Sequence, residues 1–243
     1  MELYNNVIKT IESLMGAVTA PGRFSYDPEK CWPETKEFEL VMMRDAAYEL
    51  GGNNLPAANC TCVTSDESLV GKDEILVYGP DLGELKEDSP YARVALLRVG
   101  DGINAKTEDS EKVFRAIQNI DFVKYHLYPE GFMARTSSMD NREQVRVSRQ
   151  AVSSGISFER IGNTFIRHYK EDPNVLNVRI LFITDPSVDY KALRKCAKDT
   201  GDITKTLSKI MEGMPTDCHS CSLKPICDEV EGMKELHFGK AKS

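Results

Sequence analysis

Three cysteines near the C-terminus, Cys218, Cys221 and Cys227, are the residues of this chain best suited to metal chemistry. They lie in the run Asp217-Cys-His-Ser-Cys-Ser-Leu-Lys-Pro-Ile-Cys-Asp228. A C-x2-C pair with a third thiol close by lets a short length of backbone direct three thiolates at one point, as iron–sulfur clusters and zinc require. The run therefore predicts a metal centre, with an iron–sulfur cluster favoured over zinc.

Both metals normally take four ligands, and no cysteine follows Cys227. Cys60 and Cys62, a C-x-C pair, are the first candidates for the fourth. We expect their thiols on opposite faces of an extended segment, so only one of them is expected to reach a given cluster. The alternative for each is a small buried apolar residue. Cys196 stands behind this pair, and Cys31 is the least favoured.

Length and composition are those of a folded domain protein: 243 residues, 41% hydrophobic and 28% charged. The net charge of −7 argues against nucleic acid and anionic membranes as partners.

We expect a cytoplasmic protein, because the N-terminal segment does not read as a signal peptide and no run approaches the roughly 18–20 apolar residues of a membrane span. In a reducing compartment, seven cysteines favour metal ligation over disulfides. His219 and His237 keep zinc open as a metal.

Four arginines form a second candidate site, for ligand or partner binding: Arg135, Arg142, Arg146 and Arg149. Arginine binds phosphate and carboxylate through paired hydrogen bonds. Salt bridges with acids such as Asp140 and Glu143 are the alternative explanation. The sequence contains no legible Ser/His/Asp series, paired-carboxylate motif or dinucleotide fingerprint, so we predict no catalytic residues.

Hydrophobic periodicity predicts strands that alternate with helices, which indicates an α+β fold with α/β-like layers, a mixed β-sheet packed with helices and a cysteine-rich C-terminal tail. Strands are expected at 37–43, 74–78, 91–99, 144–148 and 175–184. Helices are expected at 1–18, 110–127, 158–169 (with Ser157 as N-cap) and 188–198. Residues 21–33 read as a connector, and 51–54 as a turn. We divide the chain into residues 1–36 (helix and connector), 37–200 (α+β domain) and 201–243 (metal-binding segment).

Several segments form an ordered pattern across the chain, from about Ala46 to Cys227. They are Gly51-Gly-Asn-Asn-Leu-Pro-Ala57, Glu74-Ile-Leu-Val-Tyr-Gly-Pro-Asp81, Val145-Arg-Val-Ser-Arg-Gln-Ala-Val-Ser-Ser-Gly155, Ile161-Gly-Asn-Thr-Phe165, the strand Val178–Asp185 and the cysteine run. In order and spacing this pattern resembles the middle domain of the anaerobic acetyl-CoA synthase, the β subunit of the carbon monoxide dehydrogenase/acetyl-CoA synthase complex.

The resemblance implies that Cys218, Cys221 and Cys227 correspond to the first three thiolates of that family's cubane cluster, which is bridged to nickel. It also implies that the four arginines lie near coenzyme A or a partner subunit. Here the third cysteine spacing is shorter, the fourth cubane cysteine is missing and no Cys-Gly-Cys nickel motif occurs. The family's tryptophans are absent from Gly131–Gln144, which puts an inherited coenzyme A site in doubt.

We therefore expect a protein that binds a metal cluster, of the 4Fe-4S type, as a subunit or accessory module of anaerobic one-carbon and acetyl-CoA metabolism. It is not expected to be catalytic alone. Its expected partner is a protein of the carbon monoxide dehydrogenase/acetyl-CoA synthase or corrinoid methyl-transfer system. One alternative is a component of a CO-methylating acetyl-CoA synthase or methyl-transfer enzyme that another chain completes. The other is a structural or interaction domain stapled by zinc.

Overall fold

The computed structural model describes residues 1–19, 21–35, 46–100, 103, 110–137, 140–211, 221 and 224–229. Its strands are β1 (Gly22–Ser25), β2 (Ala47–Leu50), β3 (Ala57–Thr64), β4 (Glu74–Tyr78), β5 (Tyr91–Val99), β6 (Phe132–Ser137), β7 (Arg142–Ser148) and β8 (Val175–Ile183). Its α-helices are α1 (Asn5–Gly16), α2 (Ser110–Phe122), α3 (Arg149–Ser153), α4 (Phe158–Tyr169), α5 (Tyr190–Met211) and α6 (Lys224–Glu229). Short 3-10 turns lie at Pro28–Lys30, Leu82–Glu84 and Val123–Tyr125.

A five-stranded mixed sheet forms the centre of the molecule, in the order β1-β4-β8-β5-β3. β4 pairs with β8 in parallel, as β3 does with β5, while β8 and β5 are antiparallel. The strand β4 is buried along its whole length, and β5 along almost all of it. Strands buried on both faces read in sequence as almost continuous apolar runs, which explains why 74–78 and 91–99 were recognisable.

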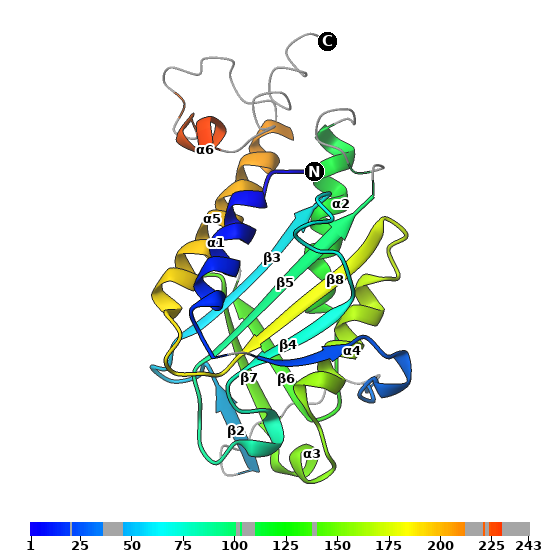
Figure 1. Ribbon diagram of the computed structural model, residues 1–243, viewed down its shortest axis with the longest axis vertical. Helices are drawn as coiled ribbons and strands as arrows, with labels where there is room; N and C mark the ends of the chain where they lie inside the picture. The colour runs from blue at the N-terminus through cyan, green and yellow to red at the C-terminus, as the bar shows by residue number, and fades with distance from the viewer. Residues whose placement is uncertain are drawn as a thin grey trace.

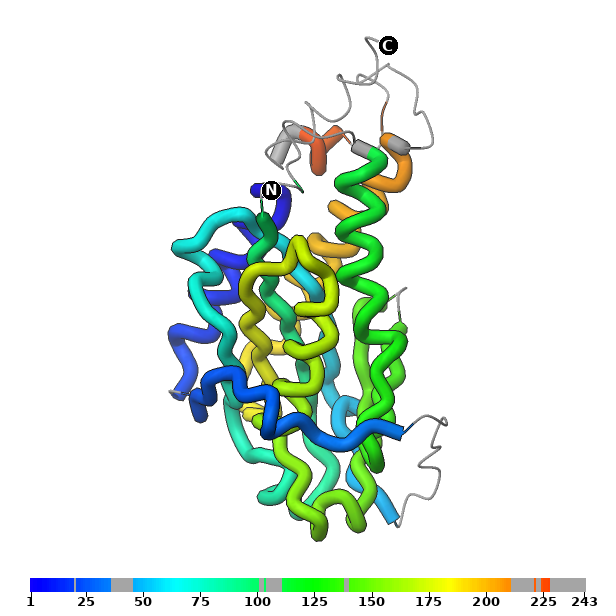
Figure 2. Tube along the Cα trace, turned by 90° about the vertical axis from the view of Figure 1, so that its right-hand side faces the viewer, coloured from blue at the N-terminus to red at the C-terminus, as the bar shows by residue number. Residues whose placement is uncertain are grey.

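Helices cover both faces of this sheet (Figure 1). On one face α1 and α5 pack side by side, and Arg179 of β8 donates to Glu12 of α1 at 2.8 Å. On the other face lies α4, where Phe158 stacks on Phe182 of β8 with ring centroids 4.6 Å apart. Figure 2 shows α2 running beside the C-terminal half of α5. The sheet is thus the middle layer of three.

A second, antiparallel sheet of three strands, β2-β7-β6, packs against the end of the large sheet (Figure 1). The turn that follows β2 brings the chain from the small sheet to the large one. Gly51 in this turn has φ of +65°, and a Cβ there would lie 2.8 Å from the Cβ of Ala57. The predicted turn at 51–54 is confirmed, and its glycine is required by both the backbone conformation and the close approach of β3.

Most of the predicted elements are confirmed, and the fold is α+β with a mixed sheet packed with helices. The Ser157 side chain caps α4 by accepting from the backbone N–H of Arg160, as expected. The connector predicted at 21–33 was wrong in part: Gly22–Ser25 forms β1, which pairs with β4. This edge strand is largely exposed and so lacks an apolar pattern.

The predicted strand at 37–43 lies outside the described residues, as does most of the cysteine-rich tail. None of the described helices has the length and apolarity needed to cross a bilayer.

Candidate functional site

The cysteine run is described only in part. Cys218 lies outside the described residues, whereas Cys221 and Cys227 are both half-buried. Cys227 belongs to α6, and it packs against the hydrophobic core together with Ile226. The Ile226 side chain also lines a cavity of about 280 Å³ between α1 and α5. The second half of the run is therefore held against the α1–α5 face of the molecule.

Among the residues that the structure describes, no group of three or more Cys, His, Asp or Glu side chains is arranged to hold a metal ion. Cys218, His219 and His237 are not among these residues. The donor set itself still suits a soft metal, since it offers a C-x2-C pair with a third thiol. The metal centre at Cys218, Cys221 and Cys227 accordingly stays a prediction.

Cys60 and Cys62 lie on the same face of β3, so the expectation of opposite faces was wrong. Side chains alternate along a strand, and residues two apart therefore share a face. The hydrogen bond between the two thiols, with burial, raises the pKa of Cys60. The sulfur of Cys62 lies 3.5 Å from the hydroxyl of Thr200 in α5. Both thiols are buried beneath α5, where they behave as small core residues.

Cys196, the next candidate, lies in α5 and lines the same cavity as Ile226 of α6. Its side chain is almost fully buried, and burial, followed by the nearby charge of Asp199, raises the pKa of its thiol to about 11. Cys60 and Cys62 do not line that cavity. Of the three buried cysteines, Cys196 therefore lies beside the same cavity as a residue of the cysteine run, Ile226.

Two of the four predicted arginines have partners within the small sheet. The guanidinium of Arg146 donates to the Glu49 carboxylate at 2.7 Å. That of Arg149 lies 5.3 Å from the ring centre of Tyr48, a distance suited to a cation–π contact. These contacts tie β7 and the start of α3 to β2.

The other two arginines are differently placed. Arg142 donates to the carbonyl oxygens of Gly51 and Leu55, at 3.4 and 3.3 Å, and so fixes the turn after β2. Its Nε is buried without a hydrogen-bond partner. Arg135 is exposed on β6. The structure therefore distributes the four arginines along the small sheet, and Arg142 alone among them lines the basic cleft described below.

Glu143, which the sequence suggested as a partner for these arginines, pairs instead with Arg93 of β5. Both side chains are fully buried, and Arg93 Nε donates to Glu143 Oε1 at 2.8 Å. Asn59, Tyr91 and Thr136 also donate to the same carboxylate, at 2.9, 3.3 and 2.9 Å. This buried carboxylate joins the two sheets through its several hydrogen bonds, and its role is therefore to stabilise the fold.

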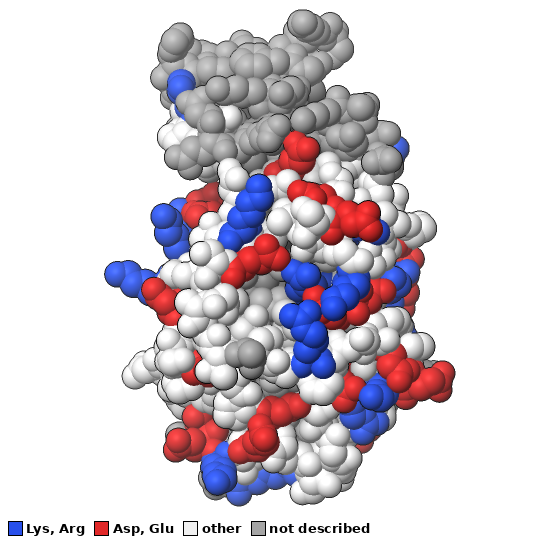
Figure 3. Space-filling view, in the orientation of Figure 1, with Lys and Arg blue, Asp and Glu red and all other residues white. Residues whose placement is uncertain are grey.

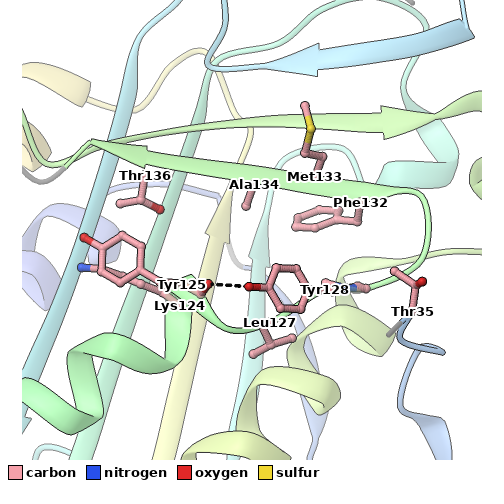
Figure 4. Close-up of a pocket in the computed structure, with 10 residues that line it drawn as sticks. Thr35, Lys124, Tyr125, Leu127, Tyr128, Phe132, Met133, Ala134 and Thr136 are labelled. Carbon is pink, nitrogen blue, oxygen red and sulfur yellow. Dashed lines mark hydrogen bonds between the residues drawn. The ribbon is translucent and has the colours of Figure 1, made fainter. Parts of the chain in front are cut away.

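The segment 131–144, where the family's tryptophans are absent, lines a cavity of about 140 Å³ (Figure 4). Phe132 from β6 lies on the side of Leu127 and Tyr128, whereas the Met133 side chain points to the opposite side of the strand. The Tyr128 hydroxyl donates to the carbonyl of Tyr125 at 3.3 Å. Small-molecule pockets usually enclose about 300–1,000 Å³. This cavity is too small for a ligand of the size of coenzyme A.

A larger cleft of about 750 Å³ lies between three parts of the chain: residues 53–57 after β2, residues 140–142 between β6 and β7, and one side of α5. We name it the basic cleft, because six of its lining residues are cationic, namely Arg142, Lys191, Arg194, Lys195, Lys198 and Lys205. This cleft was not predicted from the sequence. The only sequence signal is the recurrence of Lys and Arg at 191, 194, 195 and 198, which places them on one side of a helix.

Two comparisons relate the sequence of this chain to known proteins. The family described as "CO dehydrogenase/acetyl-CoA synthase complex beta subunit" has a sequence model that matches residues 34–188. The "Carbon monoxide dehydrogenase/acetyl-CoA synthase subunit alpha" of Moorella thermoacetica is 28% identical over 151 residues. The matched part is 61% of this chain but 20% of that relative. Because the family match covers most of the chain and includes β2 to β8, the chain belongs to the family of the CO dehydrogenase/acetyl-CoA synthase complex beta subunit.

Proposed function

We propose that this chain is a metal-cluster-binding module of acetyl-CoA synthase-related metabolism. The observation that carries the proposal is the family match over residues 34–188, followed in the same chain by the C-x2-C run. The chain spans about a fifth of the length of the relative it matches, so the activity of that protein cannot be transferred as a whole. The module is proposed as a subunit or accessory component.

Cys218, Cys221 and Cys227 would hold the cluster, a 4Fe-4S centre, in this proposal. Cys196 is our choice for the fourth thiolate, ahead of Cys60 and Cys62, because it lines the cavity that Ile226 enters from α6. The core packing of Cys227 supports the same choice. A high thiol pKa does not prevent ligation, since metal binding itself displaces the proton.

Metal analysis of protein purified without oxygen tests the cluster. We expect iron and sulfide in stoichiometric amounts and a broad visible absorption from thiolate-to-iron charge transfer. Replacement of Cys218, Cys221 or Cys227 by Ala should abolish the colour in each case. Stoichiometric zinc without iron would instead support the structural alternative, in which zinc only staples the C-terminus.

A second set of variants tests the fourth ligand. Cys196→Ala should lower the iron content and change the visible spectrum, whereas Cys62→Ala should leave both unchanged. Cys62→Ala is the control matched in burial, and Cys31→Ala is a second control, because Cys31 is a half-buried thiol that follows a 3-10 turn packed on α4. An unchanged cluster in Cys196→Ala would assign the fourth ligand to another residue or to a partner chain.

We propose that the chain does not synthesise acetyl-CoA by itself. The Cys-Gly-Cys motif that binds nickel in the family it belongs to is missing from its sequence. The assay is exchange of label between carbon monoxide and the acetyl carbonyl after reconstitution with iron, sulfide and nickel, and no exchange above a metal-only control is expected. The chain would act with a protein of the carbon monoxide dehydrogenase/acetyl-CoA synthase or corrinoid methyl-transfer system. Exchange that appears only after purified subunits of that system are added would favour an enzyme completed by another chain.

A further inference from the structure

The basic cleft concentrates positive charge in a chain that is acidic overall. Six cationic and two acidic side chains line it, whereas the whole chain carries a net charge of −7. On the face that Figure 3 shows, basic and acidic side chains are interspersed. In the cleft, by contrast, cationic side chains predominate.

Most of the cations in the cleft lack an acidic partner. Lys198 pairs with Asp202 at 2.5 Å. In the part of the chain that the structure describes, Lys191, Arg194 and Lys195 have no carboxylate within 4.0 Å, and neither does Lys205. The guanidinium of Arg142 donates to two carbonyl oxygens, and its Nε has no hydrogen-bond partner among the described residues. The cleft therefore carries uncompensated positive charge.

This arrangement is unfavourable for α5 itself. Like charges three and four positions apart on a helix repel each other, and Lys191, Arg194, Lys195 and Lys198 contain four such pairs. The positive end of the helix dipole is already compensated, because the Asp189 carboxylate caps α5 by accepting from the backbone N–H of Ala192 at 3.0 Å. The repulsion among the four side chains remains, and a bound anion would relieve it.

Most of the cationic residues of the cleft lie outside the part of the chain that matches the family. The family match ends at residue 188, and five of the six cations lie on α5, which begins at Tyr190. The matched part contributes the opposite wall, which consists of the turn at 53–57 and Arg142. The charge of this site is thus a feature added by the helix that follows the matched domain.

The shape and chemistry of the cleft fit a small, multiply charged anion. Its volume of about 750 Å³ lies in the range of small-molecule sites. Lysine and arginine side chains bind phosphate oxygens through charge-assisted hydrogen bonds. Asn53 and Asn54 also line the cleft, and their side-chain amides can donate to the same oxygens. From these observations we propose that the basic cleft is a binding site for a small molecule that carries two or more phosphate groups, of the diphosphate class.

Calorimetric titration of the full-length protein with inorganic pyrophosphate tests this site at low ionic strength. We expect saturable binding that weakens as salt is added, because the contacts are between exposed charges. Orthophosphate, with less charge, should bind more weakly. Titration with ADP shows whether a nucleoside attached to the diphosphate adds affinity. The cleft does not depend on the cysteine run, so iron content measured on the same samples separates this proposal from the proposed cluster.

The decisive variant is Lys191→Gln/Arg194→Gln/Lys195→Gln, which should weaken pyrophosphate binding by about tenfold or more through the loss of charge-assisted contacts. The matched control, Lys9→Gln/Lys86→Gln/Lys209→Gln, removes the same charge from exposed residues that do not line the cleft. It should bind like the unmodified protein, and circular dichroism should show both variants folded. Equal weakening in the two variants, or no pyrophosphate binding by the unmodified protein at millimolar concentration, would overturn the proposal.

Discussion

Arg93 and Glu143 form a two-pronged ion pair that is completely shielded from solvent and joins the two β-sheets. Arg93 lies in β5, in the large sheet, and Glu143 lies in β7, in the small one. The guanidinium also lies 4.2 Å from the ring centre of Phe165 in α4. One buried charge pair therefore contacts three parts of the fold, and the position of the small sheet depends on it.

Loss of either partner of this pair should strongly destabilise the protein. We expect Arg93→Ala and Glu143→Ala each to lower the free energy of unfolding by about 3–5 kcal/mol, because the remaining charge stays buried without its partner. Urea unfolding followed by circular dichroism measures the change. Glu87→Ala, at an exposed carboxylate, is the control and should change stability by less than about 0.5 kcal/mol. A cost below about 1 kcal/mol in both buried variants would show that water reaches the pair.

The same pair should make the free energy of unfolding depend on pH in the acidic range. Burial by itself would raise the pKa of Glu143, but the charge of Arg93 and the hydrogen bonds from Arg93 and Thr136 outweigh it and lower the pKa. The unfolded chain then binds the proton more tightly than the folded one. The contribution is complete above the unfolded carboxyl pKa of about 4.3 and is lost as the pH falls below that value toward the folded pKa.

The measurement compares wild type with Glu143→Gln by urea unfolding between pH 7 and pH 3. The difference in unfolding free energy should be constant down to about pH 5 and should shrink below that, since only the wild type can be protonated at this position. Contributions of other carboxylates cancel in the difference. A difference that stays the same at pH 3 would contradict the lowered pKa.

Gly162 in α4 should not tolerate a methyl group. A Cβ at this position would lie 2.5 Å from Cγ1 and 2.9 Å from Cγ2 of Ile75 in β4. We expect Gly162→Ala to cost about 1–2 kcal/mol by overpacking, in spite of the better helix propensity of alanine. Gly16→Ala is the control, because a Cβ on Gly16 meets no atom within 4 Å. The pair should be coupled: Gly162→Ala should cost less in an Ile75→Ala background than in the wild type.

The C-terminal boundary of the folded domain can be tested by truncation. The expected boundary at residue 200 falls inside α5, whose residues Ile203, Leu207 and Ile210 are buried. We propose a boundary after Met211 instead. A chain that ends at Met211 should fold without metal, whereas one that ends at Thr200 should lose several kcal/mol through the loss of these apolar contacts. Equal unfolding midpoints in urea for the two truncations would contradict this boundary.

The elements with strong local signals were predictable from the sequence. The buried strands β4, β5 and β8 are apolar runs bounded by turn residues, and α4 has both a helical apolar pattern and a serine cap. β1 gave no such signal, because an edge strand is stabilised by backbone pairing with β4 and leaves its side chains exposed. β3 was not predicted either, although it is buried at every position, because its residues Ala57–Thr64 are mostly small or polar. Local patterns report runs of large apolar side chains, and they fail where a strand lacks them.

The sequence by itself determined the spacing of Cys218, Cys221 and Cys227, because ligand spacing within a short run is local. It also determined the order of segments by which the family is recognised. Only the tertiary structure decided that Glu143 pairs with Arg93, fifty positions away, and that Cys60 and Cys62 lie beneath α5. It likewise decided that Arg142 and α5 enclose one cleft. These contacts depend on how strands and helices pack, and packing brings together residues whose separation along the chain carries no periodic signal.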